Sequence, residues 1–122
     1  GEGSIWEAAM SASNFKLGNV IGIVDRNRLM IDGKTEDVMA LEPFCDKWRA
    51  FGWDVVEIDG HDFDQLDEAL SHAWAATDQP VLIMANTVKG KGVDFMENNV
   101  VYHYASADSE LCAKAKASIM KG

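Results

Sequence analysis

Hydrophobic residues fall into three short runs along this chain, separated by segments in which they recur at helical spacing. The runs cover residues 19–24, 53–58 and 81–85, and all three contain valine and isoleucine. The first run is typical of a strand covered on both faces, as in a parallel sheet flanked by helices. The second run is predicted to be a strand, and the third a buried strand. The first run is followed abruptly by polar residues and then by the turn-forming pair Asp32-Gly33. This pattern predicts a buried strand that leads into a polar loop.

The segments around these runs predict helices. Ser4 and Glu7 have the spacing of a capping box, Asp62 precedes the third amphipathic segment as a cap, and Asp108 precedes the last one. The residues expected on buried helix faces are Ile5, Ala8, Ala9, Ala12 and Phe15; Leu41, Phe44, Cys45 and Trp48; Phe63, Leu66, Ala69, Leu70, Ala73 and Trp74; and Leu111, Ala115 and Ile119. Helix, strand, helix, strand, helix, strand is the order that parallel crossovers produce. The fold class is therefore predicted to be α/β, with at least three parallel strands and flanking helices.

The length of the chain limits the number of domains, and its net charge argues against some classes of binding partner. A chain of 122 residues is one domain's worth, and its net charge of −9 argues against a nucleic-acid or anionic-membrane partner. Cys45 and Cys112 lie far apart and outside any CxxC motif or Cys/His cluster. We therefore expect both to be free thiols that serve as ordinary packing residues. We find no signal peptide and no apolar run long enough to span a bilayer, so the default expectation is a cytoplasmic protein.

Asn27 is the first candidate for chemistry. Ligands of parallel sheets gather beyond the carboxyl ends of the strands, where Asn27 is expected, and its amide oxygen suits a hard cation such as Mg²⁺ or Ca²⁺. The alternative is a turn residue whose side chain bonds its own backbone. His61 is expected to be a turn residue, His72 to lie exposed or at the core edge, and the four tryptophans Trp6, Trp48, Trp53 and Trp74 to be packing residues.

Several linked motifs, in one order, resemble transketolase over essentially the whole chain up to about residue 103. They are residues 2–8, 25–29, 31–33, 51–53, 58–62, 87–92, 95–98 and 102–103. Transketolases use thiamine diphosphate to move a two-carbon ketol unit from a ketose phosphate to an aldose phosphate. The resemblance implies that residues 1–122 form one partial α/β domain, similar to the C-terminal half of the family's diphosphate-binding (PP-type) domain.

The resemblance also implies roles for individual residues. Asn27 matches the Asn that closes the family's metal motif, and Leu29 matches the residue whose carbonyl binds the metal. The cofactor-binding residues implied are Glu2, Gly3, Asn27, Leu29, Ile31, Lys89 and His103, with thiamine diphosphate and Mg²⁺ or Ca²⁺ as the cofactors. His103 and Glu2 are the implied catalytic residues, and Glu7 joins Glu2 in a carboxylate network between paired active sites. For Glu7 the alternative is a capping acid, for Lys89 a solvated loop lysine, and Tyr104 stands where the family usually has glycine.

The chain contains neither the family's upstream Gly-Asp-Gly motif nor its pyrimidine-binding domain. We therefore expect negligible activity from these 122 residues alone. The expected partners are sugar-phosphate substrates and the missing transketolase segments or a complementary subunit, in a homo-oligomer or hetero-oligomer. A fragment of a longer polypeptide is favoured over one subunit of a split enzyme. Two rival interpretations are a non-catalytic α/β interaction module and a related thiamine-diphosphate enzyme, such as a deoxyxylulose-phosphate synthase-like or dihydroxyacetone synthase-like protein.

Overall fold

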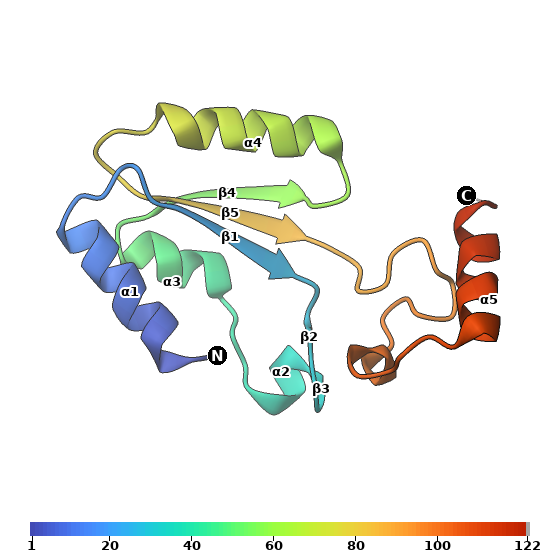
Figure 1. The fold of residues 1–122 in the computed structure, drawn as a ribbon. Helices are drawn as coiled ribbons and strands as arrows, with labels where there is room; N and C mark the ends of the chain where they lie inside the picture. Colours follow the sequence, from blue (N-terminus) through green and yellow to red (C-terminus); the bar gives the residue numbers. More distant parts are fainter. Residues whose placement is uncertain (122) are drawn as a thin grey trace. The chain divides into compact units, whose positions relative to one another are not determined.

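A computed structural model of the chain describes residues 1–121 and contains a three-stranded parallel sheet with helices on both faces (Figure 1). The elements are α1 (Gly3–Asn14), β1 (Ile21–Arg26), β2 (Leu29–Met30), β3 (Gly33–Lys34), α2 (Thr35–Val38), α3 (Phe44–Ala50), β4 (Asp54–Asp59), α4 (Phe63–Ala75), β5 (Val81–Asn86), the 3₁₀ helix η1 (Val100–His103) and α5 (Ser109–Ile119). Strand order is β1-β5-β4. The predicted α/β class and the three parallel strands are confirmed.

The chain divides into two compact units. The first comprises residues 1–26 and 39–87, and so contains the parallel sheet with α1, α3 and α4. The second comprises residues 27–38 and the chain from residue 88 onward, and so contains the β2–β3 hairpin with α2, η1 and α5. No helix among residues 1–121 is both long and apolar enough to cross a membrane.

Strand β5 lies at the centre of the sheet and builds two cores with its alternating side chains. Leu82 and Met84 pack with residues of α1 and α3 on one face. Val81, Ile83 and Ala85 pack with α4 on the other face. Each of these five residues is buried, since successive side chains of a strand point to opposite faces and both faces are covered by helices.

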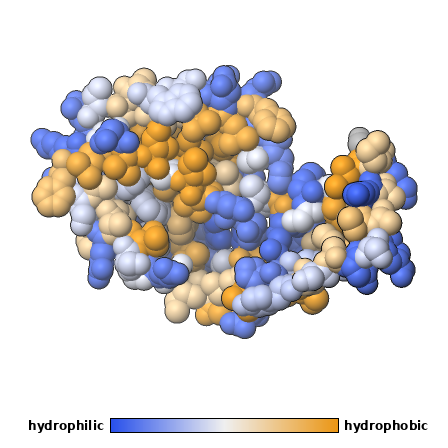
Figure 2. Space-filling view, in the orientation of Figure 1, coloured by the Kyte–Doolittle hydropathy of each residue, from blue (hydrophilic) through white to orange (hydrophobic). Residues whose placement is uncertain are grey.

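Strand β1 departs from the prediction that its apolar run is covered on both faces. Among residues 1–121 it pairs only with β5, so it is an edge strand of the sheet that these residues form, and Ile23 is 62% exposed. Hydrophobic side chains accordingly remain visible over the strands of the sheet (Figure 2). The first four residues of β1 are uncharged, as in an interior strand, and its charges come only at its end, at Asp25 and Arg26. Strand β4 at the other edge carries charges already at Asp54 and Glu57, which is how exposed edges are usually protected.

Helix α1 forms where expected, but it starts without the predicted capping box and buries only part of the predicted face. Its N-cap is Glu2, and Ser4 lies inside the first turn, so the predicted capping box is wrong. Ile5 and Phe15, expected in the core, are 49% and 70% exposed. Ala8, also expected in the core, is exposed. Ala9 and Ala12 are buried as predicted, and Trp6 packs beside them, so the helix meets the core through these three residues, whose spacing is compatible with one helix face.

Two aromatic residues of α4 that were predicted to be buried are exposed. Phe63 is 85% exposed and Trp74 is 71% exposed, because α4 meets the sheet through Leu66, Ala69 and Ala73. Trp74 is therefore not a packing residue. Trp48 and Trp53 are each 5% exposed, and Trp6 packs against their cluster, as predicted.

The cap of α4 is confirmed and carries a pH prediction. Asp62 accepts hydrogen bonds from the Gln65 side chain and from the backbone N–H groups of Gln65 and Asp64, which hold the pKa of Asp62 below its usual value. A lowered carboxyl pKa stabilises the fold above the unfolded value, about 3.9, and this gain is lost as the pH falls through the folded value. We expect Asp62→Ala to lower the melting temperature at neutral pH, and the gap to wild type to shrink in acid. An equal gap at both pH values would contradict this.

Gly18 occupies a site that has no room for a side chain. A Cβ there would lie 2.1 Å from the backbone carbon and oxygen of Thr77 and 2.6 Å from the nitrogen of Asp78. We expect Gly18→Ala to destabilise the protein by about 1–3 kcal/mol, because the backbone around Thr77 must shift. Chemical denaturation measures this, and Asn19→Ala, at an exposed neighbour, should change stability by less than about 0.5 kcal/mol. Equal effects of the two substitutions would refute the steric explanation.

The second unit is built from turns and short helices. The predicted basic loop follows β5, with positive φ angles at Gly90 (75°) and Gly92 (90°). Helix α5 begins as predicted after Asp108, whose side chain accepts the N–H of Leu111, and it returns to the loop where the Asp94 N–H donates to Ser118 Oγ. Ile119 is 58% exposed, so its predicted place on a buried face is wrong, because no residue of α5 is buried.

Candidate functional site

The carboxyl ends of the three parallel strands lie at one edge of the sheet. Arg26 at the end of β1 is in register with Asn86 at the end of β5, and Asp59 at the end of β4 is in register with the same Asn86. Asn27 is the next residue after β1, and Thr87 is the next after β5. Asn27 therefore follows the carboxyl end of a strand, as the sequence predicts, which is the side of parallel sheets where ligands bind.

The Asn27 side chain makes the local bond that the turn interpretation predicts. Its Oδ1 accepts the backbone N–H of Leu29 at 3.0 Å, across Arg28, whose φ is 63°. An amide oxygen has two lone pairs, so this bond leaves one acceptor position on Oδ1. The turn role and a ligand role are compatible in the same oxygen.

Leu29 contributes a carbonyl on the side of the hairpin that faces away from β3. Thr35 N–H donates to the Arg28 carbonyl, which makes Arg28 and Thr35 a hydrogen-bonded pair. Pairs alternate along an antiparallel ladder, so Leu29 and Lys34 form a non-bonded pair. The N–H and C=O of Leu29 then point away from β3, the same side on which its N–H meets Asn27 Oδ1.

These two oxygens fit one part of a magnesium site. Mg²⁺ prefers oxygen ligands in octahedral geometry and keeps phosphate oxygens and waters in its shell. Among residues 1–121 there is no group of three or more His, Cys, Asp or Glu side chains able to hold a metal ion. The donors offered by Asn27 and Leu29 are neutral and too few for a complete shell, so a metal held here needs further ligands.

The remaining predicted residues of the second unit lie in the β2–β3 turn and on the chain beyond β5. Lys89 is half-buried, and its carbonyl accepts the N–H of Asn98 at 2.9 Å. His103 is the exposed last residue of η1, and its ring meets Tyr104 edge-on with centroids 4.7 Å apart. Tyr104 thus packs beside His103 at the position where the resemblance leads one to expect glycine. Ile31 lies in the turn between β2 and β3 and is 51% exposed.

Glu2 and Gly3 belong to the first unit, at the start of α1. Glu2 is the N-cap residue, and its exposed side chain makes no capping hydrogen bond. Gly3 is the first helical residue, and a Cβ built there would meet no described atom within 4 Å. Glu7 is also exposed on α1. The structure thus groups the predicted residues by unit: Glu2 and Gly3 in the first, and Asn27, Leu29, Ile31, Lys89 and His103 in the second.

Sequence reasoning missed a buried charge directly before Asn27. Arg26 is 5% exposed, and its Nη2 donates to Glu42 Oε1 at 2.7 Å, while its guanidinium lies over the Phe44 ring at 5.8 Å. Glu42 Oε2 in turn accepts the Phe44 N–H at the start of α3. The end of β1 is thereby tied to α3. The sequence signal was an arginine two residues after a run expected to be core, but the glutamate that pairs with it, Glu42, lies outside any of the motifs.

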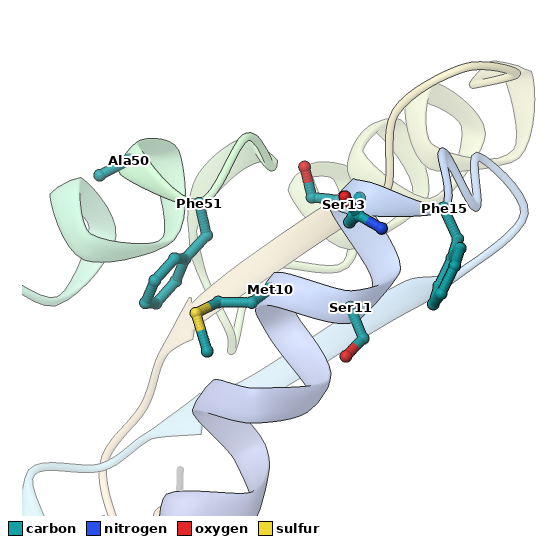
Figure 3. Close-up of a pocket in the computed structure, with 7 residues that line it drawn as sticks. Met10, Ser11, Ser13, Phe15, Ala50 and Phe51 are labelled. Carbon is teal, nitrogen blue, oxygen red and sulfur yellow. The ribbon is translucent and has the colours of Figure 1, made fainter.

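The surface hollow between the ends of α1 and α3 is not the predicted site. It is lined by Met10, Ser11, Ser13, Asn14, Phe15, Ala50 and Phe51 and has a volume of about 570 Å³. Figure 3 shows Met10 and Phe51 extending toward each other, with Ser13 and Phe15 nearer the end of α1. No predicted catalytic, cofactor or metal residue lines this hollow.

Comparison with known proteins finds transketolases both among family models and among individual relatives. Residues 1–119 match the family model described as transketolase, thiamine diphosphate binding domain. The chain is 43% identical over 120 residues to the 6-deoxy-6-sulfo-D-fructose transketolase subunit SqwG of Clostridium sp., covering 98% of this chain and 44% of that protein. It is 44% identical over 110 residues to an apulose-4-phosphate transketolase subunit of Phocaeicola vulgatus, covering 90% of this chain and 39% of that protein.

A solved structure gives the same result for the fold. The transketolase of Campylobacter jejuni superposes with a TM-score of 0.89 at 34% sequence identity, covering 98% of this chain and 18% of that one. The present chain therefore spans less than half the length of each of these relatives.

Proposed function

The chain belongs to the transketolase family as part of its thiamine diphosphate binding domain, and on that premise we propose that it supplies half of a magnesium-dependent cofactor site in a complete transketolase. The observation that carries the proposal is the pair of oxygens from Asn27 and Leu29 beyond the carboxyl end of β1. The reaction proposed for the complete protein is transfer of a two-carbon ketol unit between sugar phosphates.

Charge supports the need for a metal. A diphosphate concentrates negative charge, and this chain carries a net charge of −9, so a bound cation offsets their repulsion. Asn27 Oδ1 and the Leu29 carbonyl would hold that cation, with diphosphate oxygens and residues outside this chain as the other ligands. Ca²⁺, another hard cation with oxygen preference, is expected to substitute for Mg²⁺.

Three further residues are proposed to contact the cofactor or the substrate rather than the metal: Lys89, His103 and Glu2. The Lys89 ammonium is a point charge suited to a phosphate oxygen. His103 is exposed on η1, where it can hydrogen-bond the transferring group or move a proton. Gly3 and Ile31 are proposed to contact the cofactor, and Glu2, with Glu7, to form carboxylates shared between paired active sites. When bound, thiamine diphosphate supplies the nucleophile and electron sink, and the protein supplies orientation and electrostatics.

The names of the relatives support a multi-subunit assembly, because two of them are named as subunits of a transketolase. We propose that this chain works with further transketolase segments or a complementary subunit, in a dimer with paired active sites. The unpaired thiols of Cys45 and Cys112 suit the reducing cytoplasm.

Complementation tests the proposal. Mg²⁺ and thiamine diphosphate are titrated into the isolated chain and into the chain combined with the segments that complete a transketolase, with turnover of ketose and aldose phosphates as the readout. We expect turnover only in the combined sample and only with both cofactors. Failure of the combined sample to bind thiamine diphosphate would refute the proposal and favour a non-catalytic interaction module.

A further inference from the structure

Two side chains that no motif joins meet at the carboxyl edge of the sheet. Thr87 Oγ1 donates a hydrogen bond to Asp25 Oδ1, between positions 62 residues apart in sequence. Asp25 is the penultimate residue of β1, and Thr87 is the first residue after β5. The contact is possible because β1 and β5 are adjacent and in register, with Asp25 opposite Ala85 and Arg26 opposite Asn86.

Thr87 is held from three directions. Its backbone N–H donates to the Arg26 carbonyl at 3.4 Å, which continues the β1–β5 pairing past the end of β5. On the β4 side, a Cβ added to Gly60 would lie 2.6 Å from Thr87 Cγ2, so the backbone of Gly60 packs directly on that methyl group. Gly60 N–H also donates to the Asn86 carbonyl at 2.8 Å. The Thr87 hydroxyl therefore has a defined direction, toward Asp25.

Both partners lie two residues before a residue proposed to bind the cofactor. Asn27 follows Asp25 by two positions, and Lys89 follows Thr87 by two positions. The two connections leave the sheet at neighbouring points, and the Asp25–Thr87 hydrogen bond joins them at those points. Asp25 is exposed and lies within a strand rather than at the start of a helix, so neither burial nor capping explains it.

We infer that Asp25 and Thr87 form a positioning pair, which sets the starting geometry of the Asn27 turn and of the Lys89 loop for binding metal and diphosphate. This inference rests on the proposed function. The pair touches neither metal nor cofactor: it acts through Asn27 and Lys89. Removal of a group hydrogen-bonded to a metal ligand typically changes metal affinity about 10- to 100-fold, and we expect an effect near the lower end of that range because this pair acts through two residues of backbone.

The test uses the complete protein and measures the Kd of thiamine diphosphate by calorimetry at a fixed Mg²⁺ concentration below saturation, so that a loss of metal affinity is visible in that Kd. Thr87→Val removes the hydroxyl and keeps the shape, Asp25→Ala removes the acceptor, and Thr87→Ser restores the donor. We expect each of the first two to raise Kd about 10-fold or more, the double variant to be no worse than either alone, and the serine variant to bind like wild type. Thr77→Val, at an exposed threonine before β5, should leave Kd unchanged.

A second readout needs no cofactor. Hydrogen exchange of the Leu29 amide, which is protected by Asn27 Oδ1, should be faster in Thr87→Val than in wild type or Thr87→Ser. Wild-type affinity in both Thr87→Val and Asp25→Ala, or losses that simply add in the double variant, would overturn the inference alone. A wild-type protein that binds no thiamine diphosphate would overturn the proposed function and this inference with it.

Discussion

Replacing Asn27 with alanine in the complete protein is expected to weaken thiamine diphosphate binding by about 100-fold at a fixed Mg²⁺ concentration, at the upper end of what outer-shell changes cost, because a direct ligand is lost. The substitution removes the amide oxygen and also the acceptor of the Leu29 N–H. The substitution therefore removes one of the two oxygen ligands that this chain is proposed to offer to the metal, and it disturbs the position of the other, the Leu29 carbonyl. Calorimetric titration at several Mg²⁺ concentrations measures the effect.

The control separates a ligand from a turn residue. Asp59 makes the same kind of local bond at the end of another strand of the sheet, since its Oδ1 accepts the His61 N–H at 2.9 Å, two residues on. If Asn27 served only its turn, Asn27→Ala and Asp59→Ala would lower stability by similar small amounts and leave cofactor affinity nearly unchanged. A large affinity loss confined to Asn27→Ala supports the metal role, and unchanged affinity in that variant excludes it.

Replacing Trp53 with alanine is expected to give the largest loss of stability, about 3–5 kcal/mol, the usual cost of truncating a buried aromatic residue. Trp53 is 5% exposed and packs edge-on against Trp48 at 4.9 Å between ring centroids. Its Nε1 donates to the Ala9 carbonyl at 2.8 Å, which ties the start of β4 to α1. Urea unfolding followed by circular dichroism measures the change, and recovery of soluble protein serves if the variant does not fold.

Two comparisons locate the source of that stability. Trp74→Ala, at a residue 71% exposed, should change stability by less than about 0.5 kcal/mol. Trp48 Nε1 is buried and has no hydrogen-bond partner among the described residues, so Trp48→Phe removes an unsatisfied donor. Trp53→Phe instead removes the hydrogen bond to the Ala9 carbonyl. It should lower the free energy of unfolding by about 1 kcal/mol more than Trp48→Phe does. Equal costs for the two phenylalanine variants would show that the Ala9 bond contributes nothing.

The parts of the fold that were predictable from sequence are those set by local signals. The start of α4 follows from Asp62, whose cap bonds reach only Asp64 and Gln65. Strand β5 was predictable because a run buried on both faces leaves no polar position in Val81–Ala85. The exposure of Ile23 was not, since it depends on which strand is central, and that is a long-range property of the sheet.

The candidate site divides in the same way. Asn27 was found because it adjoins an apolar run in sequence, and its turn bond to Leu29 is local. The Asp25–Thr87 contact and the Arg26–Glu42 pair depend on strand register and on the path of a connection, so no spacing rule indicates them. Family resemblance supplied roles for Glu2, Lys89 and His103 that spacing alone does not provide.

A crystal structure of the complete protein with thiamine diphosphate and Mg²⁺ tests the central claim most directly. We predict that Asn27 Oδ1 and the Leu29 carbonyl oxygen both lie in the metal shell, at about 2.0–2.1 Å from the ion. A metal–diphosphate complex bound without either oxygen would contradict the account.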